Sequence, residues 1–471
     1  MIICPLDCPF AEMLYNAGDF RMLVEATLLK KWWRSDRLWT SNAFYRRFRR
    51  IALWIDTHSL MRSQYWPREK LIAFQDKKID ALLRRASALP FWHAILARAQ
   101  VDLAECMDLK VLRRLPITTK GDFRRETVHE YTSTDLVRTS FLDRSSGSTG
   151  KPFGFYHDRS FELRSFAVCE RIFLTAGGGA RYPVISMRAK NRRGFAFSNY
   201  HFFHVRGYHA IRHRLAHLRE LISSLEKNVI LFGVSSSLME LARLAREQNV
   251  RLPFRAILAA GEELAEPQRR EIENALGARV FMYYALSEVG RLAFECPERR
   301  LHLCEEWAYI EIIDDAGNVL PPGSEGRVIV TAFENHVMPF IRYDTGDRGI
   351  IVEDDCPCGR TLRTMRLRGR QIDLIEFSDG RTVSPVDVAA VFHRNLSAVH
   401  QFQIVRTGDH TFLVRVVAGR DFDGALSMLT EQLAQMLHPS ATVTLDAGAT
   451  LVTGPNGKAI TYIDERKADH A

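Results

Sequence analysis

Residues 145–152 read SSGSTGKP and combine small hydroxyl side chains with two glycines and one lysine. Glycine tolerates backbone conformations that let N–H groups approach a ligand closely. Successive N–H groups and hydroxyls then form a concave site for phosphate oxygens, to which a lysine adds positive charge. The segment is not a Walker P-loop, because its glycine spacing differs and Pro152 follows Lys151. By itself it is consistent with a phosphate-binding loop or with a structural turn.

On the C-terminal side of this loop, short apolar or β-branched runs alternate with helical stretches. NVILFGV precedes SSLMELARLAREQ within 228–248, and FRAILAAG precedes EPQRREIENALG within 254–277. This alternation is typical of an α/β domain with a largely parallel sheet. From Glu306 onward, strand patterns separated by turn residues such as DDAGN predict a β-rich part. The C-terminal part has the pattern of a small α+β unit.

On the N-terminal side, the chain has a mostly helical pattern up to about residue 105. In LIAFQDKKIDALLRRA, at 71–86, apolar residues recur at the spacing of one helix face. The whole chain has 471 residues. Since one hydrophobic core rarely serves a chain of this length, we expect two domains.

The net charge of +9 is concentrated in the basic segment between Lys30 and Arg50, which also carries several tryptophans and phenylalanines. An amphipathic basic helix can lie on an anionic membrane or bind a partner protein. The favoured alternative is a helical arm whose aromatic side chains pack on the protein while its arginines stay solvated. Nucleic-acid binding is the least favoured, because no recognition motif accompanies the charge.

No stretch approaches the roughly 18 apolar residues that indicate a membrane-spanning helix. The N-terminus, MIICPLDCPFAEM, lacks the basic start and long apolar run of a signal peptide. We therefore expect a cytoplasmic protein, in which free thiols are normal.

Further segments follow the glycine-rich loop in a fixed order. They are LAAGEEL (258–264), YYALSE (283–288), RYDTGD (342–347), GRQID (369–373) and GPNGK (454–458). With the loop, they resemble the motifs of the adenylate-forming superfamily of acyl-CoA synthetases. The resemblance is to its phenylacetate-CoA-ligase-like and CapK-like branch, and it extends from about Trp66 to Lys458.

The resemblance implies a role for each matched residue. Tyr284 would stack on adenine, Ser287 would face the α-phosphate, and Glu288 would coordinate magnesium. Asp347 would accept hydrogen bonds from the ribose hydroxyls, and Lys458 would be the adenylation lysine. The remaining implied contacts are Gly261 and Glu262 at adenine, Arg370 near the ribose, and Ser145, Ser146, Gly147, Ser148, Thr149, Gly150 and Lys151 at the β- and γ-phosphates.

The fold and activity implied by the resemblance are those of a two-domain ligase. We expect a helical basic extension (1–65), an AMP-binding adenylation domain of mostly parallel sheets flanked by helices with a β-rich subdomain (66–369), and a small mobile α+β lid domain (370–471). ATP would activate a carboxylic acid as its acyl-adenylate, and the acyl group would pass to a thiol, most simply that of CoA. Positioning and charge neutralisation would supply most of the catalysis.

Two departures from the family pattern leave alternatives open. Ile372 stands where the family has an acidic hinge residue, with Asp373 next to it, and Ala285 replaces a glycine. The acceptor could therefore be a carrier protein, an amine or a hydroxyl instead of CoA. A degenerate nucleotide-binding scaffold is the non-enzymatic alternative, although retention of Glu288, Asp347 and Lys458 argues against decay.

Four cysteine and histidine residues suggest a zinc site. Cys296 and His302 are followed by CPCGR with Cys356 and Cys358, and four such ligands suit a structural, tetrahedral zinc ion. Parts of the phenylacetate-CoA-ligase-like branch have a similar arrangement. Cys304 is an alternative ligand, and unmetallated thiols are the alternative interpretation.

The segment between the phosphate loop and residue 258 is where the family places its acyl pocket. It is rich in aromatic residues, and one of His201, His204 or His209 could contact the substrate carboxylate, although core packing is the favoured role for each. Aromatic walls would suit an aryl or apolar acid. The sequence names neither the acid nor the oligomeric state.

Overall fold

The computed structural model divides into two compact units, Met1–Asp56 and Thr57–Ala471. None of the described helices has the length and apolar character needed to cross a bilayer. The basic segment, Lys30–Arg50, lies mostly outside the described residues. The structure describes residues 43–102, 104, 107–125, 127–138, 140–144, 153–179, 182–188, 200–204, 208–225, 228–262, 264–370, 375–383, 385–395, 397–448, 451–452 and 461–466.

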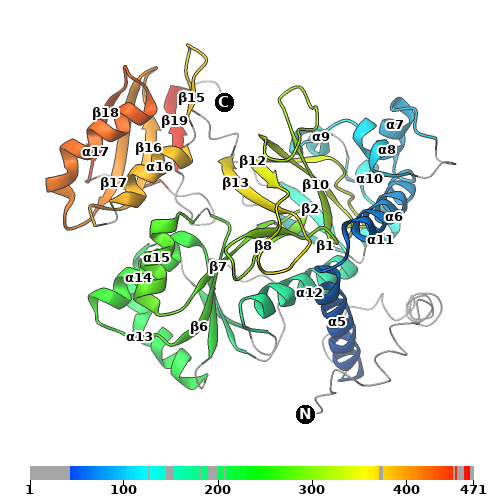
Figure 1. Cartoon of the computed structure of the whole chain (residues 1–471), viewed down its shortest axis with the longest axis horizontal. Helices are drawn as coiled ribbons and strands as arrows, with labels where there is room; N and C mark the ends of the chain where they lie inside the picture. The colour runs from blue at the N-terminus through cyan, green and yellow to red at the C-terminus, as the bar shows by residue number, and fades with distance from the viewer. Residues whose placement is uncertain are drawn as a thin grey trace. The chain divides into compact units, whose positions relative to one another are not determined.

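An 11-stranded sheet forms the centre of the larger unit, in the order β10-β11-β12-β13-β9-β8-β7-β6-β5-β3-β4. Within this sheet, strands β3 to β7 pair in parallel, whereas the pairings among β7 to β13 are antiparallel. The predicted parallel sheet and β-rich part are therefore the two halves of one sheet (Figure 1). The strands are β3 (Val184–Arg188), β4 (Tyr200–His204), β5 (Val229–Gly233), β6 (Phe254–Ala260), β7 (Val280–Leu286), β8 (Gly290–Glu295), β9 (Leu301–Leu303), β10 (Ala308–Ile313), β11 (Glu325–Ala332), β12 (Tyr343–Val352) and β13 (Thr364–Arg370).

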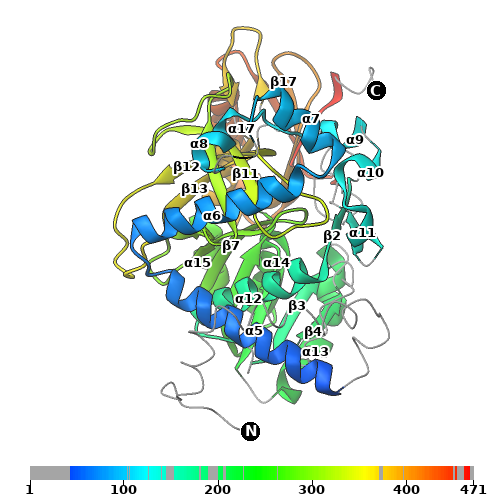
Figure 2. The same cartoon turned by 90° about the vertical axis from the view of Figure 1, so that its right-hand side faces the viewer.

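Helices cover both faces of the parallel half. Alternate residues of β5 join different cores, since Ile230 packs in one cluster and Leu231 in another. Helices α14 and α15 pack against β6 and β7, whereas α12 packs against β8 (Figure 2). Burial on both faces explains why β5 is apolar at every position, as parallel strands usually are. These helices are α12 (Arg159–Thr175), α13 (Tyr208–Ser224), α14 (Ser235–Glu247) and α15 (Glu266–Leu276).

The helical pattern predicted up to about residue 105 is confirmed for the described part of it, which begins at residue 43. In α6, the residues Leu71, Ile79, Leu82 and Leu83 are buried, whereas Phe74 is half-buried. The helices of this part are α5 (Ala43–Ser63), α6 (Arg68–Ala86), α7 (Pro90–Arg98), α8 (Leu109–Arg114), α9 (Lys120–Arg125), α10 (Val128–Tyr131) and α11 (Thr134–Val137).

The glycine-rich segment connects two short strands. β1 (Phe141–Arg144) and β2 (Gly154–His157) pair antiparallel, with Arg144 opposite Gly154. Residues 145–152 themselves lie outside the described part of the chain. They nevertheless join the two arms of a hairpin, and α12 begins directly after it.

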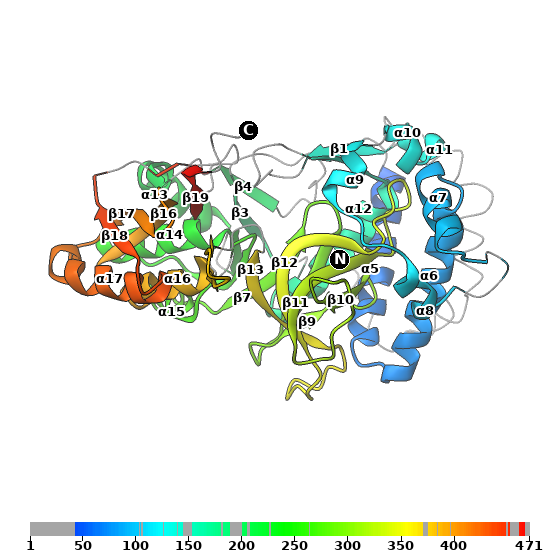
Figure 3. The ribbon, with the colours of Figure 1, turned by 90° about the horizontal axis from the view of Figure 1, so that it is seen from above.

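The C-terminal part has its own sheet and its own apolar core, as the predicted α+β unit requires. The sheet order is β18-β17-β16-β19, and α16 and α17 pack beside it (Figure 3). The boundary at residue 370 and the mobility of this part stay predictions. The elements are β14 (Ile375–Glu376), β15 (Thr382–Val383), α16 (Pro385–Arg394), β16 (Val399–Arg406), β17 (Thr411–Ala418), α17 (Phe422–Leu437), β18 (Thr442–Asp446) and β19 (Tyr462–Asp464).

Candidate functional site

Glu288 lies in the turn between β7 and β8, where the sheet changes from parallel to antiparallel pairing. The residue is only 2% exposed. The Tyr343 hydroxyl donates a hydrogen bond to Glu288 Oε1 at 2.9 Å. Lys120 Nζ lies 3.3 Å from the same oxygen. A buried carboxylate needs polar partners, and these two groups satisfy Glu288 Oε1 and hold the side chain in place.

Burial raises the pKa of Tyr343 far above its ordinary value, and the neighbouring Glu288 raises it further. The hydroxyl therefore stays protonated and serves as a permanent donor to Glu288. Tyr343 itself is fully buried at the start of β12.

Tyr284 and Asp347 are in direct contact. The Tyr284 hydroxyl donates to Asp347 Oδ2 at 2.6 Å, and both residues are buried. The backbone N–H of Asp347 donates to Thr345 Oγ1 at 3.0 Å, which fixes the strand locally. Arg370 in β13 is the direct partner of Asp347 in the strand register. The structure thus brings together the adenine and ribose residues expected from the sequence, which come from β7, β12 and β13.

Gly261 and Glu262 follow β6 directly. Gly261 has a φ of 81°, a conformation that favours glycine. Glu262 Oε2 accepts a hydrogen bond from the backbone N–H of Ser236 at 2.8 Å, in the first turn of α14. Because β6 and β7 are parallel neighbours, this segment and Ser287 lie at adjacent carboxyl ends of the sheet. Such an edge is the usual ligand-binding edge of α/β sheets.

Several predicted site residues lie outside the described part of the chain. They are Ser145, Ser146, Gly147, Ser148, Thr149, Gly150, Lys151, Ile372, Asp373 and Lys458, together with the side chains of Arg370, His201, His204 and His209. Their roles stay predictions.

Sequence reasoning missed Lys120 and Tyr343. Tyr343 could have been found, because alternate residues of a strand share one face, and the buried face of β12 contains Tyr343, Thr345 and Asp347. Lys120 carries no comparable signal, since nothing in its neighbourhood points to a segment as distant as Glu288.

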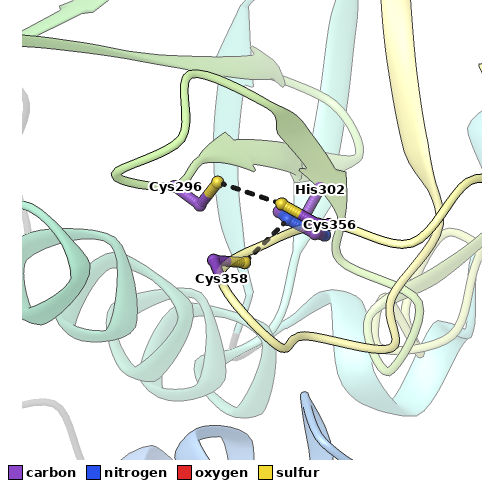
Figure 4. Close-up of side chains that lie close together, drawn as sticks. All are labelled: Cys296, His302, Cys356 and Cys358. Carbon is purple, nitrogen blue, oxygen red and sulfur yellow. Dashed lines mark hydrogen bonds between the residues drawn. The ribbon is translucent and has the colours of Figure 1, made fainter.

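Cys296, His302, Cys356 and Cys358 form one cluster (Figure 4). Their potential ligand atoms all lie within 4.8 Å of one another. Cys296 Sγ is 3.7 Å from Cys356 Sγ, and Cys358 Sγ is 3.4 Å from His302 Nε2. Cys304 is not a member of this cluster and lies instead beside the buried guanidinium of Arg171. The geometry therefore selects Cys296 over Cys304 as the partner of the other three.

His302 is oriented for metal binding. Its Nδ1 lies 2.8 Å from the carbonyl oxygen of Leu362, which leaves the Nε2 lone pair facing the thiols when Nδ1 carries the proton. Burial lowers the pKa of His302 to about 4, so the imidazole is neutral near pH 7. Neutral imidazole is the form that binds metals.

The thiols differ in their environments. Burial raises the pKa of Cys356 to about 12. Burial also acts to raise the pKa of Cys358, but hydrogen bonds from Arg360 outweigh it and lower the value. A divalent cation would favour the thiolate form of all three cysteines, which fits the chemistry of this donor set.

Comparison with family models gave no match. Among curated proteins, the chain is 28% identical over 360 residues to the phenylacetate-coenzyme A ligase of Thermus thermophilus, covering 72% of this chain and 79% of the relative. It is 25% identical over 394 residues to the phenylacetate-coenzyme A ligase of Escherichia coli, covering 79% and 87%.

Solved structures share the fold. A 2-hydroxyisobutyryl-CoA ligase in its postadenylation state superposes with a TM-score of 0.74, at 18% identity, covering 86% of this chain and 92% of that one. The anthranilate CoA ligase AuaEII gives a TM-score of 0.52 at 15% identity, covering 68% and 64%. At these identities the likeness establishes a common architecture.

Proposed function

We propose that this chain is an AMP-forming acid–thiol ligase, because its sequence is similar to phenylacetate-coenzyme A ligases and its fold is shared with a 2-hydroxyisobutyryl-CoA ligase. In the first step a carboxylate attacks the α-phosphorus of ATP, forming an acyl-adenylate and releasing pyrophosphate. In the second step the thiol of CoA attacks the acyl carbon and AMP leaves.

The observation that carries this proposal is that Tyr284 and Glu288 both contact β12, the strand that carries Asp347. Tyr284 and Glu288 come from the end of β7 and the turn after it, and Asp347 comes from β12. Tyr343 of β12 contacts Glu288, so one contact joins β7 to β12 and a second joins the β7–β8 turn to β12. Segments distant in sequence thus bring together an aromatic ring and two carboxylates, and we propose that these carboxylates bind the ribose and magnesium.

Within this proposal, Glu288 would hold magnesium, which neutralises phosphate charge when bound. Its burial, and the fact that the two donors found among the described residues converge on Oε1, fit that role. Lys120 would add a positive charge at the same place. The hydroxyls and N–H groups of residues 145–150, with Lys151, would bind the β- and γ-phosphates, and Lys458 would approach the attacking carboxylate.

We also propose that Cys296, His302, Cys356 and Cys358 hold a structural zinc ion. It would join the β8–β9 turn to the loop that follows β12. A cytoplasmic location and a peripheral membrane contact through the basic segment stay proposals, as do the domain limits at residues 65 and 369.

The deciding experiment measures pyrophosphate release from ATP over a panel of aryl, short-chain, medium-chain and long-chain carboxylic acids, with and without CoA. Release with one acid class, together with CoA-dependent AMP formation, supports the ligase and identifies its substrate class. Release that is indifferent to CoA points to a carrier protein, an amine or a hydroxyl as the acceptor. Protein that binds ATP but releases no pyrophosphate with any acid would favour the nucleotide-binding scaffold.

A further inference from the structure

A cavity of about 610 Å³ lies among α7, the end of α8 and α9. This volume falls within the range of small-molecule sites, roughly 300–1,000 Å³. None of the residues assigned above to nucleotide or zinc lines it. The proposed ligase activity therefore does not account for it.

The inner wall of the cavity is apolar and firmly packed. It includes Phe91, Ile95 and Ile117. Ile95 is only 4% exposed, and the Phe91 ring packs against Trp92 and Phe123 with centroid distances of 5.0 and 5.5 Å. Since these rings belong to the main core, this wall is formed before any ligand arrives.

The rim of the cavity is strongly basic. It carries the guanidinium groups of Arg98, Arg114 and Arg125 and a single carboxylate, Asp122. Asp122 pairs with Arg125 on the same helix. No carboxylate of the described residues is recorded within ion-pair distance of Arg98 or Arg114. Within the described part of the chain, the two positive charges of Arg98 and Arg114 are therefore not balanced by a carboxylate.

Backbone carbonyls hold these two arginines in place. Arg114 Nη2 donates to the carbonyl oxygens of Ala99 and Gln100 at 2.8 and 2.9 Å, and Arg98 Nε donates to that of Ala94 at 3.2 Å. A guanidinium has five N–H groups, so each arginine keeps donors beyond those that hold it. Fixed guanidinium groups are well suited to carboxylates, which they bind through paired hydrogen bonds.

We propose that this cavity is an accessory binding site for an amphipathic organic carboxylate. The carboxylate would pair with Arg98 and Arg114, and the apolar body would lie against Phe91, Ile95 and Ile117. An inorganic anion would leave the apolar wall uncovered, and a neutral apolar molecule would leave the two charges unpaired. Thr118 and Asp122 line the cavity, while Lys120 between them contacts Glu288. The site therefore shares its wall with the segment that reaches the candidate catalytic centre.

The test is methyl NMR on the full chain with ¹³C-labelled isoleucine methyl groups, because Ile95 and Ile117 both line the cavity. Octanoate is the amphipathic probe, inorganic phosphate the charge-only probe and 1-octanol the chain-only probe. We expect saturable shifts of both methyl signals with octanoate and much weaker responses to the other two. Signals of Ile95 and Ile117 that do not move with octanoate would overturn the proposal, as would equal responses to 1-octanol.

Variants separate this cavity from a carboxylate bound at the proposed active site. Arg98→Gln should weaken octanoate binding at least about tenfold, because it removes a charge-assisted contact. Ala99→Leu keeps the arginines and should weaken binding by filling the cavity, which makes it an independent test. Arg124→Gln, an exposed arginine of α9 outside the cavity lining, is the matched control. If Arg98→Gln and Ala99→Leu both bind octanoate like Arg124→Gln, the assignment is wrong.

Discussion

At the residue scale, the candidate catalytic centre depends on single contacts made to buried carboxylates. Glu288 Oε1 receives both the Tyr343 hydroxyl and the Lys120 ammonium group. Asp347 Oδ2 receives the Tyr284 hydroxyl. A hydrogen bond to a charged group contributes roughly 1.5–3 kcal/mol, so each of these contacts should be visible in kinetics.

Tyr343→Phe removes the hydroxyl but keeps the buried ring. We expect kcat/KM for pyrophosphate release to fall about tenfold, because Glu288 loses a donor and its orientation becomes less defined. The assay is pyrophosphate release titrated with ATP and magnesium. Tyr309→Phe is the matched control, since Tyr309 is also buried but its hydroxyl contacts Arg113. Equal activity of the two variants would remove Tyr343 from the site.

At the element scale, strand register places the site residues. Gly290 begins β8 directly after the Glu288 turn, with a φ of 86°. A Cβ at that position would lie 2.7 Å from Trp307 Cζ2, so only glycine fits this close approach.

The loop carrying Cys356 and Cys358 continues into Arg360 and Thr361, which bind Gln64 between α5 and α6. The candidate zinc cluster therefore also stabilises the contact between Gln64 and the loop that joins β12 to β13.

Cys356→Ser tests the zinc cluster. We expect loss of bound zinc and a melting temperature lower by at least about 5 °C, because loss of a structural metal is among the most destabilising changes. Zinc content by elemental analysis and thermal unfolding are the measurements. In Cys304→Ser the zinc content should be unchanged, because Cys304 lies outside the cluster. Zinc lost equally from both variants would contradict this ligand set.

At the scale of the whole molecule, the sheet continues from a parallel half to an antiparallel half, and the site forms where the two halves meet. The C-terminal part has a separate core and carries the predicted adenylation lysine, Lys458. Nucleotide binding and adenylation should therefore be separable by mutation.

Lys458→Ala is expected to abolish detectable pyrophosphate release while ATP still binds. The reason is that the residues assigned to adenine, ribose and magnesium lie in strands of the large sheet or in the segments directly after them. Calorimetric titration with ATP, run alongside the release assay, measures both properties. Unchanged turnover in this variant would show that another group performs adenylation.

Global stability should decrease in acid partly because of His336. Burial, and next the positive charge of Arg85, lower the pKa of this histidine to about 3 from its ordinary 6.5. The unfolded chain therefore takes up this proton at a higher pH than the folded chain. The stability contributed by neutral His336 is complete above about pH 6.5 and is lost as the pH falls towards 3.

Thermal unfolding at pH 7.5 and pH 5 measures this effect. The difference in melting temperature should be smaller in His336→Gln than in the wild type. His129→Gln, which changes an exposed histidine, should behave like the wild type. An equal pH dependence in all three proteins would count against His336.

The sequence by itself determined the α/β class, the order of the motifs proposed to bind nucleotide, and a set of candidate zinc ligands that still included Cys304. These features are local, because helix and strand periodicities and short loop motifs depend on residues close together in the chain. The pattern of residues 254–277, for example, predicts a strand followed by a helix, and these residues form β6 and α15.

Only the tertiary structure decided which distant residues meet. The pairing of Lys120 and Tyr343 with Glu288, the choice of Cys296 over Cys304, and the basic cavity at α7 all depend on strand register and helix packing. The continuation of the parallel half of the sheet into the antiparallel half is likewise decided only by the tertiary structure. Burial and long-range pairing involve segments far apart in sequence, so no local pattern encodes them.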